Sequence, residues 1–365
     1  MKFSVNQGIL RNHLTKIVKV VKENTFIPIL NNFLIEADAE NQALSITGSD
    51  STIFLKHLIS GAKIKEGGIT TLPAVPLTKL INALPNTMIE FRTEDNGMRI
   101  IAGKSKFFLR SMGHEDFPKG HDIEDAGIEV DLLDTQKSIG QVAFSTAKDL
   151  INPYLTGVRI SEENIISADG RRLAIIAKSF LDRAVLLPDS FVSHFLSLEG
   201  EKATFFFSES VVKVITPTIT LSGVMLIGVE KFPKVGSFIQ SHMPYGAIIN
   251  LSDILPPLER ALIFQSKGAI LVIKFLINPE GTMTIQSYGQ DTTGNSQEII
   301  PVEIIDFPED MEEFSIALNL GFVNEGLSSL KSSQVRFEYQ DAKSMARFVA
   351  DDWYYIMAPV RLEGE

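Results

Sequence analysis

The chain has 365 residues, 44% of them hydrophobic, a composition that supports a large buried core and a length that predicts two or three domains. It contains no cysteine, which excludes disulfides, thiolate metal sites and a cysteine nucleophile. Together with an amino terminus that lacks a signal-peptide core, this predicts a cytoplasmic protein. The net charge of −11 argues against tight binding to phosphate backbones through clustered cations.

The first third of the chain combines helix and strand patterns in a fixed order. Helical spacing of apolar residues over Gln7–Glu23 precedes two strands joined by a turn over 31–50. A β-branched run then meets Pro73, and apolar residues three and four apart predict a short helix over Val75–Leu84. Short strands broken by turn residues complete the segment.

The same order recurs twice in the rest of the chain. Four further helices are predicted, over Asp131–Ile151, Pro188–Leu198, Leu251–Lys267 and Asn319–Lys331. Asn319 takes the capping position of the last helix. The most apolar window, 211–229, is broken by Lys213 and Pro217, so it is interpreted as strands and not as a membrane span.

Prolines at a constant offset support this repeat. Pro73 and Pro188 lie 115 residues apart, and the same offset separates Pro118 from Pro233, each in a Phe-Pro-Lys sequence. The pattern predicts three α+β domains of one fold, over 1–122, 123–244 and 245–365. Strands outnumber helices, and the helices are expected on one side.

Aspartates mark equivalent positions in the three repeats. Asp50, Asp169 and Asp291 each end a predicted strand pair. In the second repeat the sequence "SADGRRLAI" places an Asp-Gly turn between two apolar runs. Asp169 is therefore expected to be a structural turn residue, although the two arginines after it have no counterpart in the other repeats.

Several motifs occur in the order found in one known family. The start "MKFSV", the segments "FIPILNNFLIEA" and "SADGRRLA", the two Phe-Pro sequences and the terminal "MAPVRL" resemble the β subunit of bacterial DNA polymerase III, the sliding clamp. The resemblance spans all three repeats and implies tandem clamp domains. Two such chains would close head to tail into a homodimeric ring around duplex DNA, with helices lining the hole and sheets outside.

The resemblance also implies a processivity factor and not an enzyme, with no cofactor, metal or membrane. Its implied partners are double-stranded DNA bound without sequence preference, the catalytic subunit of DNA polymerase III, the clamp loader and other proteins with clamp-binding motifs.

The helices that would line the hole carry little positive charge. They sum to +2 and the rest of the chain to −13, with the range Gln7–Glu23 contributing most. The residues expected to face DNA are Arg11, Lys16, Lys19, Lys22, Lys79, Lys137, Lys148 and Arg260. Asn24 and Val75 stand where the family often has arginine, so weak DNA contact is predicted. A solvated basic helix face is the alternative.

The family's second working surface is an apolar groove between the second and third domains that binds short linear peptides. By motif its residues here are Tyr154, Leu155, Gly157, Gly170, Arg171, Arg172, Leu173, Pro233, Phe238, Ile356, Ala358, Pro359, Val360 and Arg361. Apolar side chains beside arginines suit a peptide with aromatic or aliphatic anchors. The alternative is ordinary strand ends with solvent-facing arginines.

Three departures from the family pattern affect this groove. Ser237 and Ala358 replace an arginine and a larger residue, which predicts a roomier, less charged pocket. The tail Glu363–Glu365 adds two acids near it. We therefore expect altered or weakened binding of a generic clamp-binding peptide.

Ring closure would join an edge of the first domain to one of the third. By resemblance the residues are Lys104, Lys106 and Phe107 on one side and Ile263, Phe264, Asp291 and Glu298 on the other. Because only two acids, Asp291 and Glu298, are available to pair with the lysines, apolar contact is expected to dominate the interface between the two chains. A basic edge that only protects the strand from aggregation is the alternative.

Two other function classes are alternatives to a sliding clamp. Catalysis is not expected, because none of the six histidines has metal-ligand spacing and no P-loop or G-x-S-x-G sequence is present. A diverged clamp-fold scaffold or paralogue that has lost or altered loader and polymerase binding is the second alternative.

Overall fold

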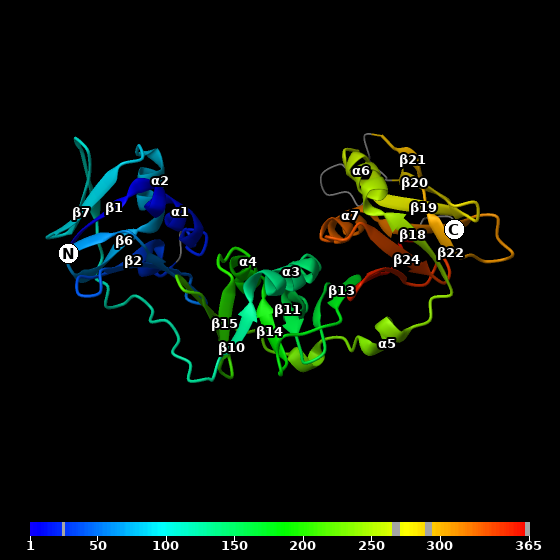
Figure 1. Ribbon diagram of the computed structural model, residues 1–365, viewed down its shortest axis with the longest axis horizontal. Helices are drawn as coiled ribbons and strands as arrows, with labels where there is room; N and C mark the ends of the chain where they lie inside the picture. The colour runs from blue at the N-terminus through cyan, green and yellow to red at the C-terminus, as the bar shows by residue number, and fades with distance from the viewer. Residues whose placement is uncertain (24–25, 265–270, 289–293, 362–365) are drawn as a thin grey trace. The chain divides into compact units, whose positions relative to one another are not determined.

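The protein is described here from a computed structural model over residues 1–23, 26–264, 271–288 and 294–361 (Figure 1). All six predicted helices are present, as α1 (Gln7–Ile17), α2 (Ala74–Ala83), α3 (Leu132–Ala143), α4 (Asp189–Phe195), α6 (Leu251–Leu262) and α7 (Leu320–Ser328). The sequence patterns did not predict α5 (Gly236–Gln240) or the 3-10 helices η1 (Pro28–Asn31), η2 (Pro153–Thr156) and η3 (Val229–Lys231).

Several helices end earlier than predicted. After α3 the hydroxyls of Ser145 and Thr146 donate to the carbonyls of Val142 and Ala143, at 3.2 and 3.1 Å. These side-chain bonds satisfy the last carbonyls and compete with another helical turn. At the other end of the chain the predicted cap is confirmed, because Asn319 Oδ1 accepts from the amide of Phe322 at 3.1 Å.

The described strands form four antiparallel sheets, here called A to D. Sheet A has the order β5 (Lys63–Glu66), β1 (Lys2–Asn6), β7 (Met88–Glu94), β8 (Gly97–Ala102), β9 (Ser105–Arg110). Sheet B has the order β10 (Ile128–Asp131), β15 (Lys202–Phe207), β16 (Val211–Ile215), β17 (Ile219–Val224), β4 (Ile53–Ile59), β3 (Ala43–Ser49), β2 (Asn32–Asp38), β6 (Gly68–Pro73).

Sheet C has the order β14 (Val185–Pro188), β11 (Gly157–Ile160), β12 (Ile165–Ala168), β13 (Arg172–Ile176), β26 (Trp353–Met357), β25 (Ala346–Ala350), β24 (Gln334–Tyr339), β18 (Tyr245–Asn250), β22 (Glu303–Asp306). Sheet D has the order β21 (Gln297–Pro301), β20 (Thr282–Tyr288), β19 (Val272–Asn278), β23 (Phe314–Asn319). The apolar window at 211–229 is thus mainly β16 and β17, as predicted, and no described helix is long and apolar enough to cross a bilayer.

The chain divides into two compact units. Unit 1 comprises Met1–Leu133 and Ser193–Met225 and contains sheets A and B, and unit 2 comprises Asp134–Val192 and Leu226–Glu365 and contains sheets C and D. The middle repeat contributes to both. Its strands β10 and β15 to β17 extend the sheet of the first repeat through the β17–β4 pair, and its strands β11 to β14 join the third repeat through β13–β26.

The aspartate turns of the first two repeats have the same construction. Asp50 Oδ1 accepts from the amides two and three residues ahead, at 3.0 and 2.8 Å, and Asp169 Oδ1 does the same at 2.9 and 3.1 Å. Gly170 has a φ of +87°, which favours glycine. The structural role predicted for Asp169 is confirmed, whereas Asp291 lies outside the described residues.

The two Phe-Pro sequences also fold alike. Phe117 and Phe232 are buried, and each donates its amide to the carbonyl three residues earlier, His114 or Val229. Phe117 packs on Ile29 and its neighbours, and Phe232 packs in the corresponding cluster of unit 2. Each sequence therefore fastens a connecting segment to a sheet.

Helix α7 packs closely on β26 because Gly326 lacks a side chain. A Cβ at Gly326 would lie 2.3 Å from Cε1 of Tyr355, a fully buried ring. We expect Gly326→Ala to lower the free energy of unfolding by about 1–3 kcal/mol, because overpacking outweighs the better helix propensity of alanine. Gly321→Ala in the same helix is the matched control, and equal urea midpoints for the two variants would contradict the close approach.

Candidate functional site

A small apolar cavity opens on sheet C in unit 2. Its volume is about 160 Å³, smaller than a site for a whole drug-sized ligand and suited to one or two anchoring side chains. Nine of the fourteen residues predicted for the groove line it: Leu155, Gly170, Arg171, Arg172, Leu173, Pro233, Phe238, Ile356 and Ala358. The sequence motifs from distant parts of the chain therefore meet at one place.

Strand pairing and a connecting segment build this cavity. Leu173 on β13 lies opposite Ile356 on β26, and the amide of Ala358 donates to the carbonyl of Arg171 at 3.1 Å. Pro233 and Phe238 come from the segment that crosses the sheet. Its position is fixed by the guanidinium of Arg347, which donates to the carbonyls of Phe238 and Ile239, both at 2.9 Å.

The other five predicted groove residues lie outside the lining of this cavity. Tyr154 packs against the apolar cluster under the pocket, and Gly157 starts β11 with no room for a Cβ against the Leu187 carbonyl. The tail residues Pro359, Val360 and Arg361 run past β26, because the amide of Val360 donates to Ala317 of β23 at 2.8 Å.

Sequence reasoning missed three lining residues, Ala168, Met345 and Met357. Ala168 and Met357 lie inside the quoted motifs "SADGRRLA" and "MAPVRL", so the motifs carried a usable signal although neither residue was predicted for the groove. Met345 comes from the β24–β25 loop and no motif marks it. Ala358 lines the cavity as expected, whereas Ser237 is exposed and outside the lining.

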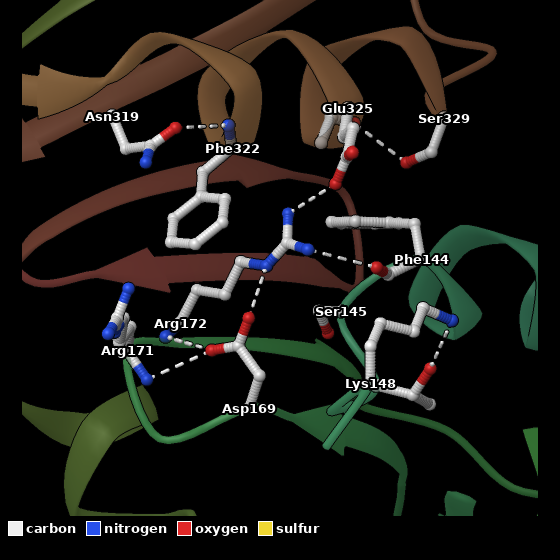
Figure 2. A network of polar contacts seen from close by, with 12 residues as sticks. Phe144, Ser145, Lys148, Asp169, Arg171, Arg172, Asn319, Phe322, Glu325 and Ser329 are labelled. Carbon is white, nitrogen blue, oxygen red and sulfur yellow. Dashed lines mark hydrogen bonds and ion pairs between the residues drawn. The ribbon is translucent and has the colours of Figure 1, made fainter. Parts of the chain in front are cut away.

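Arg172 is a buried cross-link and not a free arginine of the pocket rim (Figure 2). Its Nε donates to Asp169 at 2.9 Å, its Nη1 to Glu325 at 2.6 Å and its Nη2 to the carbonyl of Phe144 at 3.2 Å. The guanidinium also lies 4.0 Å from the ring centre of Phe322. One side chain thus joins the β12–β13 turn, the end of α3 and helix α7.

Arg171 differs from its neighbour. It is exposed, and its backbone amide is the group that donates to Asp169 in Figure 2. Its guanidinium makes no ion pair within the described residues and lies beside the cavity. Of the two arginines in "GRR", Arg171 is therefore the one available to a ligand.

The basic side chains of α1 and of the segment that follows it in unit 1 are partly neutralised by acids of the same chain. Lys16 Nζ lies 2.6 Å from Glu199 and Lys22 Nζ 2.7 Å from Asp50. The hydrogen bond from Lys16 lowers the pKa of Glu199. Burial acts to raise the pKa of Asp50, but hydrogen bonds from Lys22 and the turn hold it below its usual value.

The other predicted DNA-facing cations divide in the same way. Lys148 pairs with Asp189 at 3.1 Å and Arg260 with Glu298 at 2.5 Å. Four cations are exposed and make no ion pair within the described part of the chain: Arg11, Lys19, Lys79 and Lys137. Val75 is half-buried, and Asn24 lies outside the described residues.

Two histidines of unit 1 lie close enough to Lys16 to feel its charge. His13 of α1 and His57 of β4 face each other with 2.9 Å between their Nδ1 atoms, and His57 is 1% exposed. Burial lowers the pKa of His57 to about 3 and, helped by the cation of Lys16, that of His13 below its usual value. The pair is therefore neutral. Within the residues that the structure covers, no three His, Asp or Glu side chains converge on a metal position.

Comparisons with known proteins show which proteins the chain resembles along its length. The sequence profile of the DNA polymerase III beta subunit, N-terminal domain, matches residues 1–121. The beta sliding clamp of Chlamydia trachomatis is 28% identical over 303 residues, which cover 78% of this chain and 70% of the relative. The beta sliding clamp of Bacillus subtilis is 25% identical over 94% of both chains.

Solved structures show the same fold. The crystal structure of the sliding clamp from Bacillus subtilis superposes with a TM-score of 0.86 over 99% of both chains at 23% identity. The DNA polymerase III subunit beta from Pseudomonas aeruginosa gives 0.85 at 22% identity, over 99% of this chain and all of that one. The chain belongs to the family of bacterial sliding clamps, the β subunits of DNA polymerase III. The function of this family is that of a sliding clamp in DNA replication.

In this sliding-clamp chain, strand β9 forms an open edge of sheet A. Phe107 packs partly against the core of unit 1, whereas Phe108, which the motif did not single out, is 40% exposed. Lys104 and Lys106 are exposed beside it. Alternation along the strand places neighbouring side chains on opposite faces, and that signal identifies Phe108 as the outward ring.

Strand β21 is an open edge of sheet D in the same sliding-clamp chain. Ile299 on this strand is 65% exposed, and Ile263 at the end of α6 is 74% exposed, while Phe264 is half-buried. Glu298 is not a free acid, because Arg260 binds it with two hydrogen bonds and lowers its pKa. Asp291 lies outside the described residues.

Proposed function

We propose that this chain is a non-catalytic processivity factor that works in the cytoplasm. Two copies would close head to tail into a ring around duplex DNA. The ring would hold the catalytic subunit of DNA polymerase III. This subunit and the clamp loader would each bind the ring through a linear peptide. The observation that carries this proposal is the apolar pocket on sheet C, in a chain whose whole length has the clamp fold.

The pocket has the properties that a peptide anchor needs. Leu173 and Ile356 form an apolar floor, and Phe238 lies on a segment already held by Arg347, so little ordering is required on binding. Arg171 at the rim can pair with a peptide carboxylate or carbonyl. Because Glu325 and Asp169 occupy Arg172, that arginine contributes shape and not charge.

DNA contact is expected to be weak. Lys16, Lys22, Lys148 and Arg260 already pair with acids, and such exposed pairs must be broken before the cation can bind phosphate. The remaining four cations give a shallow salt dependence. A ring that encircles DNA does not need tighter contact with the phosphates, since its topology prevents dissociation.

Dimer closure is expected to rest on apolar contact between β9 of one chain and β21 with the end of α6 of the other. Ile263→Lys should turn the dimer into a monomer, because burying an uncompensated ammonium at a central contact costs about 3 kcal/mol and a two-chain ring has the contact twice. Light scattering over a dilution series measures this. Leu150→Lys, which changes a side chain that is 78% exposed elsewhere in unit 2, is the matched control.

A dimer near twice 40.4 kDa for the native chain and the control, with a monomer for Ile263→Lys, supports ring closure. A native chain that is monomeric at every concentration overturns it. Loader-dependent retention on nicked circular DNA, lost when the DNA is linearised, then separates a working clamp from a diverged scaffold, which would form the ring without being loaded.

A further inference from the structure

Unit 1 has a cavity built on the same plan as the pocket of unit 2. It measures about 760 Å³ and lies on sheet B under the segment that carries Phe117 and Pro118. The Phe-Pro turn fastens that segment to the sheet as its counterpart does in unit 2. The notable difference is that this cavity is several times larger.

Strand register shows that the two floors are equivalent position by position. Phe54 is the fourth residue after Asp50, as Leu173 is after Asp169. Across sheet B the neighbours in register are Phe54, Ser222, Lys213 and Phe206. Across sheet C the same row reads Leu173, Ile356, Arg347 and Glu338.

The residues of this row differ between the two units, and the difference changes what the floor of each cavity can bind. In unit 2 Arg347 is buried, pairs with Glu338 and holds the crossing segment by its carbonyls. In unit 1 Lys213 occupies the arginine position, and Phe206 replaces the acid. Lys213 is half-buried, lines the cavity and has no ion pair within the described residues. A cation without an acid is thus left facing the cavity.

Other side chains around the cavity add an apolar anchor site and a further polar group. The ring of His121 stands edge-on to Phe54 at 5.2 Å, and its buried Nδ1 has no hydrogen-bond partner among the described residues. Ile69 and Ile215 also line the cavity. Three acids also line it: Glu36 pairs with Lys56 at 2.7 Å, and Glu115 lies 3.7 Å from Nδ1 of His114. The third, Asp122, is outnumbered by Lys213 and Lys119, two lining lysines that make no ion pair within the described residues.

We propose that this cavity, here called the second groove, binds a short acidic peptide segment of a partner protein. An apolar side chain of the peptide would rest on Phe54 and Ile215, and a carboxylate of the same peptide would pair with Lys213. A charged hydrogen bond in a half-buried site gives the acid a clear advantage over a neutral residue. The proposal goes beyond the pocket of the proposed function, because it concerns a different sheet and a different unit.

The test uses the full chain and a fluorescein-labelled five-residue peptide, leucine and phenylalanine followed by three aspartates. The variant Ala358→Trp fills the pocket of unit 2 and leaves only the second groove. In this background we expect binding to persist and Lys213→Met to weaken it about tenfold, the loss of one hydrogen bond to a charged group. Lys63→Met, at an exposed lysine of β5, is the matched control and should leave the affinity unchanged.

A second peptide with serines in place of the aspartates completes a double-mutant cycle. It should bind about tenfold more weakly than the acidic peptide to the chain with Lys213, and equally weakly to Lys213→Met. Loss of all binding with Ala358→Trp, or equal affinities for Lys213→Met and Lys63→Met, overturns the second groove. Binding to the unit 2 pocket is read separately, from the difference between the native chain and Ala358→Trp, so failure of one site does not imply failure of the other.

Discussion

Replacing Arg172 with methionine should lower the free energy of unfolding by about 3–5 kcal/mol, because the change leaves the groups around it without their buried cation. Asp169, Glu325 and the carbonyl of Phe144 would all lose a donor, and Phe322 would lose the guanidinium stacked on its ring. Urea unfolding followed by circular dichroism measures the shift.

Arg171→Met is the matched control, since it alters the adjacent, exposed arginine and should change stability by no more than about 0.5 kcal/mol. Arg172→Lys should behave more like the methionine variant, because an ammonium cannot reach three separate acceptors in a fixed plane. Coincident urea midpoints for Arg172→Met and Arg171→Met would show that the network does not stabilise the fold.

The second large effect is a loss of stability in mild acid caused by the His13–His57 pair. In the unfolded chain a histidine binds a proton near pH 6.5, whereas in the folded chain His57 does so only near pH 3. The contribution is therefore complete above pH 6.5 and falls by about 1.4 kcal/mol per pH unit below it. Between pH 7.5 and pH 5.0 the chain should lose about 2 kcal/mol through His57 alone.

His57→Gln can keep a hydrogen bond to His13 and does not titrate, so its stability should change less over the same range. The measurement is the difference in urea midpoint between pH 7.5 and 5.0 for each protein. His242→Gln, at an exposed histidine, is the control and should respond to pH like the native chain. The assignment is wrong if His57→Gln and His242→Gln show the same pH response.

The repeats, the helices and the turn at Asp169 could be predicted because they depend on local patterns. Proline offsets, apolar spacing and an Asp-Gly pair each act within a few residues, and the structure repeats them from one segment to the next. The helix ends were less predictable. After α3, the hydroxyls of Ser145 and Thr146 donate to the carbonyls of Val142 and Ala143. The spacing of apolar residues in the sequence did not reveal that the helix ends there.

The roles of single charged residues could not be predicted, because their partners are remote in sequence. Glu325 lies 153 residues from Arg172, and Tyr355, another acceptor of that guanidinium, lies 183 residues away. Lys16 and Glu199 are also far apart in the sequence. The sequence around Lys16 therefore gave no sign that this cation, predicted to face DNA, is paired with an acid. The resemblance pointed to motifs whose residues meet at one cavity, but it could not distinguish Arg171 from Arg172.

The sheets that cross from one repeat to the next have a consequence for how such a chain can be divided. A fragment ending near residue 122 would leave β4 without β17, and a fragment starting near residue 245 would leave β26 without β13. Each cut bares a row of unpaired backbone groups in mid-sheet, the kind of surface that causes chains to associate edge to edge. An ancestral single repeat would have borne both kinds of edge, one complementary to the other, and could have satisfied them only by pairing with further copies of itself.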